Sequence, residues 1–296
     1  MIPWLSRVLP VPSLRSRLLR ATTVLAFTVL LVGCSIKFVY NQLDWLIPWY
    51  LDDYVTINTN QAELLDERLN QYLYWHRREQ LPLYAGFLDD IADAAQDNLT
   101  QQEMDQVFNR ARDFLDDLLA ELANPLADLM LLMDDQQVAE LVSNLEERNQ
   151  RYRQRFIETS EKAQRERRSE NMQKIVKRWV AELNEQQVEL IELWANSYHL
   201  LGEEFLQSRQ KWQGELQALL QRDDRQGLAR DQLVQLLANR PRPDGGEARR
   251  KYYANIELLK RLYLDLDRTL SSYQRSQLVR GLSSYADDFR ELAATG

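Results

Sequence analysis

The chain has 296 residues, of which 37 are Lys or Arg and 45 are Asp or Glu, so its net charge is −8, and it contains a single cysteine. One cysteine excludes an internal disulfide, and the fold must therefore rest on a packed core, for which this length is ample. The sequence has no glycine-rich phosphate loop and no Gly-x-Ser-x-Gly elbow, which removes the commonest signs of nucleotide binding and serine hydrolysis.

The N-terminal segment, residues 1–33, has the layout of a secretory signal peptide. It carries four arginines and no acid, followed by thirteen uncharged residues that end at Gly33. The sequence Leu-Val-Gly-Cys at 31–34 resembles a bacterial lipobox. This resemblance implies cleavage before Cys34 and attachment of acyl chains, palmitate among them, to that cysteine. We therefore predict a lipoprotein whose first mature residue is Cys34.

An uncleaved transmembrane helix over residues 21–40 is the alternative interpretation. Lys37 lies inside that stretch, and the uninterrupted apolar run is shorter than the ~20 residues that a membrane span needs. Cleavage removes four arginines and leaves a mature net charge of −12. Because Ser35 follows the acylated cysteine, we expect transfer to the outer membrane, with the anchored protein facing the periplasm.

Residues 34–58 form an anchor-proximal aromatic segment. Six aromatic side chains fall within seventeen residues, namely Phe38, Tyr40, Trp45, Trp49, Tyr50 and Tyr54. They could form a belt at the level of the lipid headgroups, or they could dock on the helical domain and tie the anchor to it. Acids alternate with aromatics as in a packed amphipathic helix, and we therefore favour docking.

The rest of the chain predicts an all-α fold, an elongated helical bundle. Sustained strand-like alternation is absent, and apolar residues recur at helical spacing. Two of the clearest apolar faces contain Leu65, Leu69, Tyr72, Leu73 and His76, and Leu83, Phe87, Ile91, Ala94 and Ala95. The main bundle is expected over 59–238, a Pro- and Gly-rich linker over 239–247, and a C-terminal helical pair packed on the bundle over 248–296.

Several helix starts are marked by capping boxes, in which the side chains of the N-cap and N3 residues bond each other's backbone N–H. Four such pairs are Thr100–Glu103, Asp134–Gln137, Asn184–Gln187 and Ser271–Gln274. We interpret their recurrence as ordinary capping chemistry rather than internal duplication. Pro82 and Pro125 are expected in the first turns of helices. The longest helix is expected within 134–183, with a break near 169–171.

Charge is segregated along the chain. Residues 89–147 contain sixteen acids and two arginines, whereas residues 148–178 contain eleven basic residues and four glutamates. A basic run can indicate nucleic acid or an acidic membrane surface, but an exported protein meets little nucleic acid. We expect the basic stretch to be a solvated face or to pair with the acidic helices beside it, and we expect no nucleic-acid partner.

The two histidines are weak candidates for a metal site. His76 has Glu79 three residues later, and His199 has Glu203 four residues later, so each histidine can share a helix face with a carboxylate. Neither is preceded by the Glu-x-x-His pattern of a di-iron bundle. We therefore predict no metal, no cofactor and no catalytic residue, and His76, Glu79, His199 and Glu203 remain the residues to check.

Three stretches carry a resemblance to known proteins. They read CSIKFVYNQLDWLIPWYLDDYV, RLNQYLYWHRREQLPLYAGFL and QRSQLVRGLSSYADDFRELA. Together they resemble a family of uncharacterised proteobacterial lipoproteins with a single all-helical domain of unknown function. A weaker similarity is to periplasmic chaperones with Leu-Thr-x-x-Gln motifs, from which residues 99–103 depart because Glu103 stands in place of glutamine.

These observations predict a membrane-anchored periplasmic lipoprotein that is not an enzyme. Its expected role is that of a helical binding or scaffold protein, in the manner of a chaperone. We expect a protein or peptide partner in the periplasm, and attachment of the protein to the membrane through its lipid anchor. The alternative is a metal-dependent or hydrolytic enzyme whose site forms only in the fold.

Overall fold

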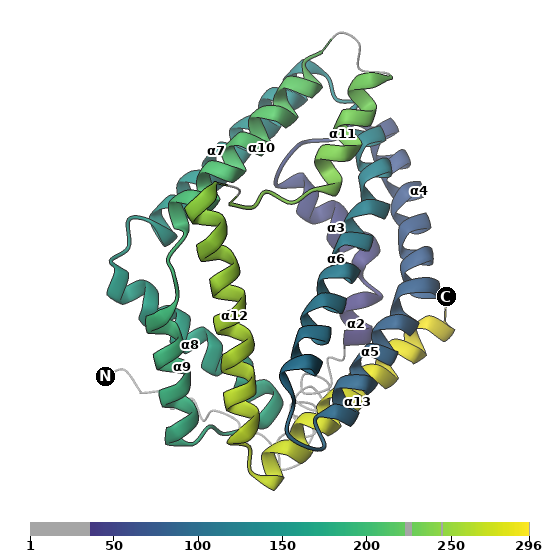
Figure 1. Ribbon diagram of the computed structural model, residues 1–296. Coiled ribbons are helices and arrows are strands. Elements are labelled where there is room, and N and C mark those ends of the chain that lie inside the picture. Colours follow the sequence, from purple (N-terminus) through teal and green to yellow (C-terminus); the bar gives the residue numbers. More distant parts are fainter. Residues whose placement is uncertain (1–35, 223–226, 244, 296) are drawn as a thin grey trace, which may run out of the picture. The chain divides into compact units, whose positions relative to one another are not determined.

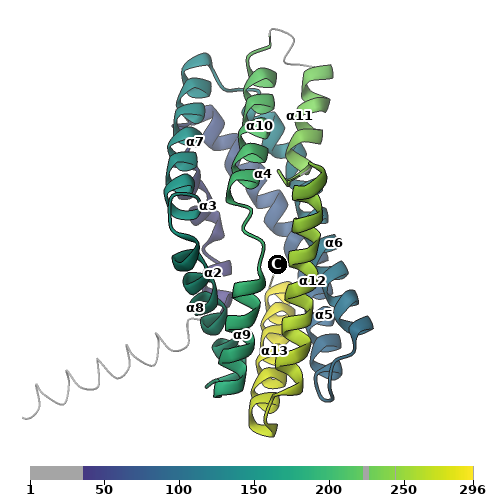
Figure 2. The same cartoon turned by 60° about the vertical axis from the view of Figure 1, so that its left-hand side comes forward.

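The computed structural model describes residues 36–222, 227–243 and 245–295, so Cys34 and the predicted leader lie outside the described residues. All regular secondary structure in these ranges is helical, which confirms the all-α class. The helices, drawn in Figures 1 and 2, are α2 (Ile36–Tyr40), α3 (Leu43–Asp52), α4 (Thr59–Trp75), η1 (His76–Gln80, a π-helix), α5 (Leu81–Ala94), α6 (Gln101–Met130), α7 (Asp135–Phe156), α8 (Glu161–Val180), α9 (Glu185–Ser197), α10 (Gly202–Leu220), α11 (Leu228–Ala238), α12 (Gly246–Arg268) and α13 (Ser272–Ala294).

Two compact units divide the chain, residues 1–43 and residues 44–296. The described part of the first unit consists essentially of the short helix α2, and the second contains the helices from α4 onward. The predicted linker falls between α11 and α12, which end and begin at Ala238 and Gly246. Everything that follows, unless stated otherwise, concerns residues 44–296.

Capping boxes open five of the described helices. All four predicted pairs are present, at the starts of α6, α7, α9 and α13, and both hydrogen bonds of each box are formed. The sequence analysis missed a fifth box, Asn58–Gln61, which opens α4. Each box satisfies two of the backbone N–H groups that a helix start leaves without an intrahelical partner.

The glutamines of four boxes also connect different helices, because their side chains meet in pairs in the interior. Gln61 and Gln137 form a cyclic amide pair, in which each Nε2 donates to the other's Oε1 at 2.9 and 2.7 Å. Each Nε2 also donates to the chain just before the partner's helix. Gln61 bonds the carbonyl of Leu132 at 2.9 Å, and Gln137 bonds the carbonyl of Thr56 at 2.8 Å. We call this pair the first glutamine joint.

The second glutamine joint repeats this pattern at the starts of α9 and α13. Gln187 and Gln274 exchange amide hydrogen bonds at 3.0 and 2.9 Å. Gln187 also donates to the carbonyl of Thr269 and Gln274 to that of Glu182. In both joints the accepting carbonyl lies two residues before the partner's N-cap. All four glutamines are buried, and each amide has its donors and acceptor occupied, as a buried polar group requires.

The helices around the two joints are arranged in corresponding ways. Helix α4 packs on α6, and α9 packs on α12; α7 packs on α10, and α13 packs along α5 (Figure 1), while α6 and α12 touch each other. Helices α4, α6 and α7 around the first joint correspond, in this order, to α9, α12 and α13 around the second. The recurrence seen in the sequence therefore involves matched tertiary contacts as well as helix capping.

Two apolar clusters fill the interior near the joints. The first joins α6, α7, α10 and α11 and contains Val55, Ala127, Met133, Val138, Leu141, Leu216, Leu220 and Leu233. The second joins α8, α9 and α12 and contains Met172, Val176, Val180, Ile191, Trp194, Ala195, Leu262 and Leu266. Burial of such side chains, at about 1.5–3 kcal/mol each, is the main favourable term for the fold.

The expected lengths of two helices are wrong. The longest described helix is α6, with 30 residues. The stretch 134–183 divides into α7 and α8 at residues 157–160, not near 169–171. The break coincides with a close approach of α10, because a Cβ at Gly202 would lie 2.6 Å from the carbonyl oxygen of Phe156.

Pro125 does not begin a helix either, whereas Pro82 lies in the first turn of α5 as predicted. Pro125 lies inside α6, where it removes one backbone hydrogen bond. The helix continues because its last turns are held from outside. Ala127 is fully buried in the first cluster, and Asp128 accepts a hydrogen bond from Arg230 of α11.

The joints predict that replacing a joint glutamine lowers the free energy of unfolding far more than replacing the glutamine next to it. Gln137→Leu or Gln187→Leu should lower the free energy of unfolding by about 2–5 kcal/mol, because an N-cap N–H, a remote carbonyl and the partner amide lose their bonds inside the protein. Gln136→Leu and Gln186→Leu, at the exposed neighbouring positions, are the matched controls and should change it by less than about 0.5 kcal/mol. Urea unfolding monitored by circular dichroism measures both, and equal effects at the two kinds of position would contradict the role given to the joints.

Candidate functional site

The four residues singled out as weak metal candidates lie in different surroundings. His76 and Glu79 belong to η1, Glu203 lies in the first turn of α10, and His199 precedes that helix. The backbone of His199 is paired with Asn255 of α12, whose Oδ1 accepts from its N–H and whose Nδ2 donates to its carbonyl. Within the described ranges, no three His, Cys, Asp or Glu side chains come together in a way that could hold a metal ion.

His76 lies instead in an aromatic cluster. Its ring centroid is 6.3 Å from that of Tyr72, 6.3 Å from that of Trp75 and 5.5 Å from that of Tyr84. Burial among these rings disfavours the charged imidazolium and lowers the pKa of His76 to about 4. His76 is therefore neutral at pH 7 and acts as a packing residue.

This lowered pKa predicts a loss of stability in acid. An unfolded histidine takes up its proton near pH 6.5, whereas folded His76 does so only near pH 4. Between these values the unfolded state binds more protons, so acidification from pH 6.5 to 4 lowers the free energy of unfolding. His76→Gln should flatten this part of the pH profile, whereas His199→Gln, at an exposed position, should leave it unchanged. Urea midpoints at half-unit pH steps test this, and identical profiles for His76→Gln and the wild type would refute it.

The basic stretch 148–178 has mostly exposed Lys and Arg residues, as expected for a solvated face, and within the acidic stretch 89–147 its described ion pairs reach Glu147. Its described ion pairs run to Asp53, Glu147, Glu161, Glu166 and Glu182. Four of the ten acids of α5 and α6 are neutralised from the C-terminal half, where Arg230, Arg240, Lys260 and Arg290 pair with Asp128, Asp116, Asp105 and Asp89. Sequence proximity is a poor guide here because α13 and α11 cover α5 and α6.

Three arginines of the basic stretch hold helices together. Arg165 donates to the carbonyls of Ala195, Asn196 and Tyr198, which are the open carbonyls at the end of α9. The guanidinium of Arg168 lies 3.4 Å from the ring centroid of Tyr198, and that of Arg148 lies 3.8 Å from the ring centroid of Tyr54. These arginines therefore have structural contacts.

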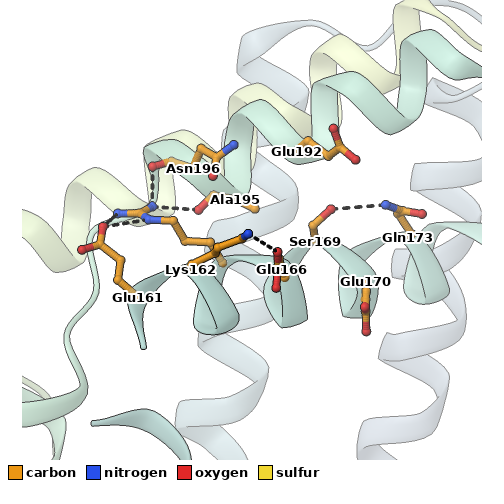
Figure 3. Close-up of a pocket in the computed structure, with 10 residues that line it drawn as sticks. Glu161, Lys162, Glu166, Ser169, Glu170, Gln173, Glu192, Ala195 and Asn196 are labelled. Atoms are coloured by element: carbon orange, nitrogen blue, oxygen red, sulfur yellow. Dashed lines mark hydrogen bonds and ion pairs between the residues drawn. The ribbon is translucent and has the colours of Figure 1, made fainter. Parts of the chain in front are cut away.

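A polar groove of about 750 Å³ lies between α8 and α9 (Figure 3). Its charged side chains are engaged largely with their own helices or with the opposite backbone. Glu161 binds Arg165, and Lys162 binds Glu166. Figure 3 shows Glu170 on α8 extending away from Glu192 on α9. The groove is thus the surface of a helix pair cross-linked by Arg165, and its ionisable groups do not converge on one point.

A second groove, between α5 and α6, has an apolar floor. It measures about 500 Å³, and its floor is formed by Phe87, Ile91, Ala94 and Val107. The rim is polar and contains Asp90, Glu103, Gln106, Asn109 and Arg110. We call it the α5–α6 groove. The sequence analysis placed Phe87, Ile91 and Ala94 on an apolar helix face, but the pattern alone did not show that part of this face stays open.

Charge around the α5–α6 groove is mainly negative. Helix α6 contains seven acids and two arginines, and of these acids Glu103 lines the groove, whereas Asp105, Asp116 and Asp128 are paired with basic residues of the C-terminal half. One of the two arginines, Arg110, is held on the rim by an ion pair with Asp90, and its guanidinium lies 5.0 Å from the ring centroid of Phe87. On the rim, Glu103 accepts hydrogen bonds from its capping partner Thr100, which lower the pKa of its carboxyl group and keep it ionised. The groove therefore offers apolar contacts under an acidic rim.

The aromatic segment is only partly docked, contrary to expectation. Its C-terminal end is held, since Tyr54 and Val55 join the first apolar cluster. The two tryptophans of α3 are exposed, Trp45 by 53% and Trp49 by 63%, and α3 has no buried residue. Alternation of acids and aromatics predicted a helix but not which of its faces is covered.

Comparison with known proteins identifies the family but no activity. The model of a family of unknown function (DUF6279) matches residues 53–242. The chain belongs to this family. No curated protein and no solved structure matches. The matched range includes the first glutamine joint and ends before α12 and α13, although α13 supplies half of the second joint and covers α5.

None of the described helices combines the length and the apolar character that a bilayer crossing requires. The predicted lipid attachment at Cys34 lies outside this range.

Proposed function

We propose that this member of the family is a lipid-anchored protein of the bacterial cell envelope that binds polypeptide segments in the periplasm, in the manner of a chaperone or scaffold. The observation that carries the proposal is the α5–α6 groove, with an apolar floor of Phe87, Ile91, Ala94 and Val107. An amphipathic segment lays apolar side chains into such a groove and keeps its polar side outward.

The charge around the groove favours one kind of segment. The ionised Glu103 on the rim, one of the seven acids of α6, favours Lys and Arg beside the apolar side chains of the partner. Charge complementarity of this kind speeds association and excludes acidic segments more than it strengthens a bound complex. The proposed client is therefore an amphipathic polypeptide segment with a basic polar face.

The lipid anchor is the second part of the proposal. It is supported by the basic and apolar leader and by the lipobox that ends at Cys34. We expect the membrane-extracted protein to begin at Cys34 and to carry acyl chains on it, in the outer membrane and facing the periplasm. Intact-mass measurement tests this directly. A species that retains residues 1–33, or one with an unmodified cysteine, would contradict it.

Binding through the groove is tested with two synthetic peptides that differ only in charge. One is an amphipathic peptide of Leu and Lys, and the other carries Glu in place of Lys. The Leu/Lys peptide should bind the full protein more tightly, by about tenfold at low salt, with a difference that shrinks as salt is added. Fluorescence anisotropy of the labelled peptides gives the two dissociation constants.

A matched pair of variants places the binding on the groove. Val107→Lys puts a like charge into the floor and should weaken binding of the Leu/Lys peptide by tenfold or more. Leu122→Lys, on the same helix but outside the groove and already 37% exposed, should not. Urea unfolding confirms that both variants are folded. Tighter binding of the Leu/Glu peptide, or equal losses in both variants, would refute the groove as the binding site.

A further inference from the structure

We propose that the exposed face of α3, formed by Trp45 and Trp49, lies in the headgroup region of the membrane that carries the anchor. This inference rests on the proposed lipid attachment and goes beyond it, because it gives the folded part of the protein its own contact with lipid. The two tryptophans are four residues apart on one helix and therefore share a face.

The exposure of these side chains is unusual within the molecule. Of fifteen exposed large hydrophobic side chains in the described ranges, five fall between residues 38 and 50. The other described tryptophans, Trp75, Trp179, Trp194 and Trp212, are buried or half-buried. Single exposed apolar residues need no explanation, but this concentration at one end of the chain does. Tryptophan favours the membrane interface, where one end of its ring system is apolar and the other is hydrated.

The short connection between Cys34 and α3 favours the lipid surface as the partner of this face. Cys34 and Trp45 are eleven residues apart, and five of the intervening residues form α2. At 1.5 Å per helical residue and about 3.5 Å per extended residue, the connection spans at most ~30 Å. With acyl chains on Cys34, the lipid surface is thus always within reach of α3.

The C-terminal end of α3 is fixed, so its face has a defined direction within residues 44–296. Arg148 of α7 pairs with Asp53 and lies over the ring of Tyr54. The hydroxyl groups of Tyr50 and Tyr54 are hydrogen-bonded to each other at 2.9 Å. These contacts turn one side of the helix toward α7 and leave the two tryptophans outward.

The charge of α3 indicates which lipid headgroups its exposed face can contact. Helix α3 carries Asp44 and Asp52 and has no Lys or Arg. A face of this composition has no attraction for anionic headgroups and is suited to uncharged or zwitterionic ones. We therefore expect contact through the aromatic rings, with little dependence on salt or on anionic lipid.

The test uses the lipidated full protein bound to phosphatidylcholine vesicles, with part of the lipid brominated near the glycerol end of the acyl chains. Bromine quenches tryptophan only at contact range. We expect brominated vesicles to quench about one third of the emission, the share of two of the six tryptophans that follow Cys34. Trp45→Phe with Trp49→Phe should abolish this quenching, whereas Trp75→Phe should retain it. Replacing half of the lipid by phosphatidylglycerol should not increase it.

Co-flotation separates failure of the anchor from failure of this inference. If the protein does not float with the vesicles, the proposed lipid attachment fails. If it floats but its emission is the same with and without bromine, the α3 face does not touch lipid and the inference is wrong. The inference is also overturned if the Trp45→Phe, Trp49→Phe variant is quenched as strongly as the wild type, or if quenching appears only with anionic lipid.

Discussion

The structure depends on one interaction used twice, a pair of buried glutamine amides that closes two helix starts against each other. A buried amide without partners costs about 1–3 kcal/mol, so each pair is favourable only when both capping boxes and both approaching chain segments are in place. The two glutamines of a pair are far apart in the sequence, by 76 residues in the first joint and by 87 in the second, so each pair connects distant segments of the chain. Apolar packing supplies most of the stability, but it tolerates alternative arrangements more readily than a fully satisfied polar network does.

Both proposed surfaces depend on these joints. In the second joint, Gln274 fixes the start of α13, and α13 packs along α5, which forms one wall of the α5–α6 groove. In the first joint, Gln137 holds the carbonyl of Thr56 in the loop that follows α3, and Glu140 accepts from the N–H and hydroxyl of the same threonine. The α5–α6 groove proposed for a polypeptide and the tryptophan face proposed for lipid are therefore positioned by polar contacts that lie elsewhere in the fold.

Local features of the fold could be predicted from the sequence, and long-range ones could not. The all-α class and four capping boxes follow from patterns of three to five residues, and Asn58–Gln61 could have been found by the same rule. Pairing of the glutamines could not, because nothing in one box identifies its partner. The break between α7 and α8 coincides with the approach of Gly202 to Phe156, and the last turns of α6 after Pro125 are held by contacts with α11, and neither contact can be read from a local pattern. Of the candidate sites, the apolar face of α5 was predictable, whereas its open part and the exposure of Trp45 and Trp49 depend on which helices cover which faces.

A double-mutant cycle tests the central claim most directly. Gln187→Leu and Gln274→Leu are measured singly and together by urea unfolding, and Gln137→Leu with Gln274→Leu provides the comparison between different joints. Within the second joint we predict a coupling energy of at least about 1 kcal/mol, because the second replacement removes a group that the first has already left without a partner. Between the joints the effects should add to within about 0.5 kcal/mol. Additive effects within the joint would contradict the account, since they would mean that the two glutamines cap their own helices and do not hold the fold together as a pair.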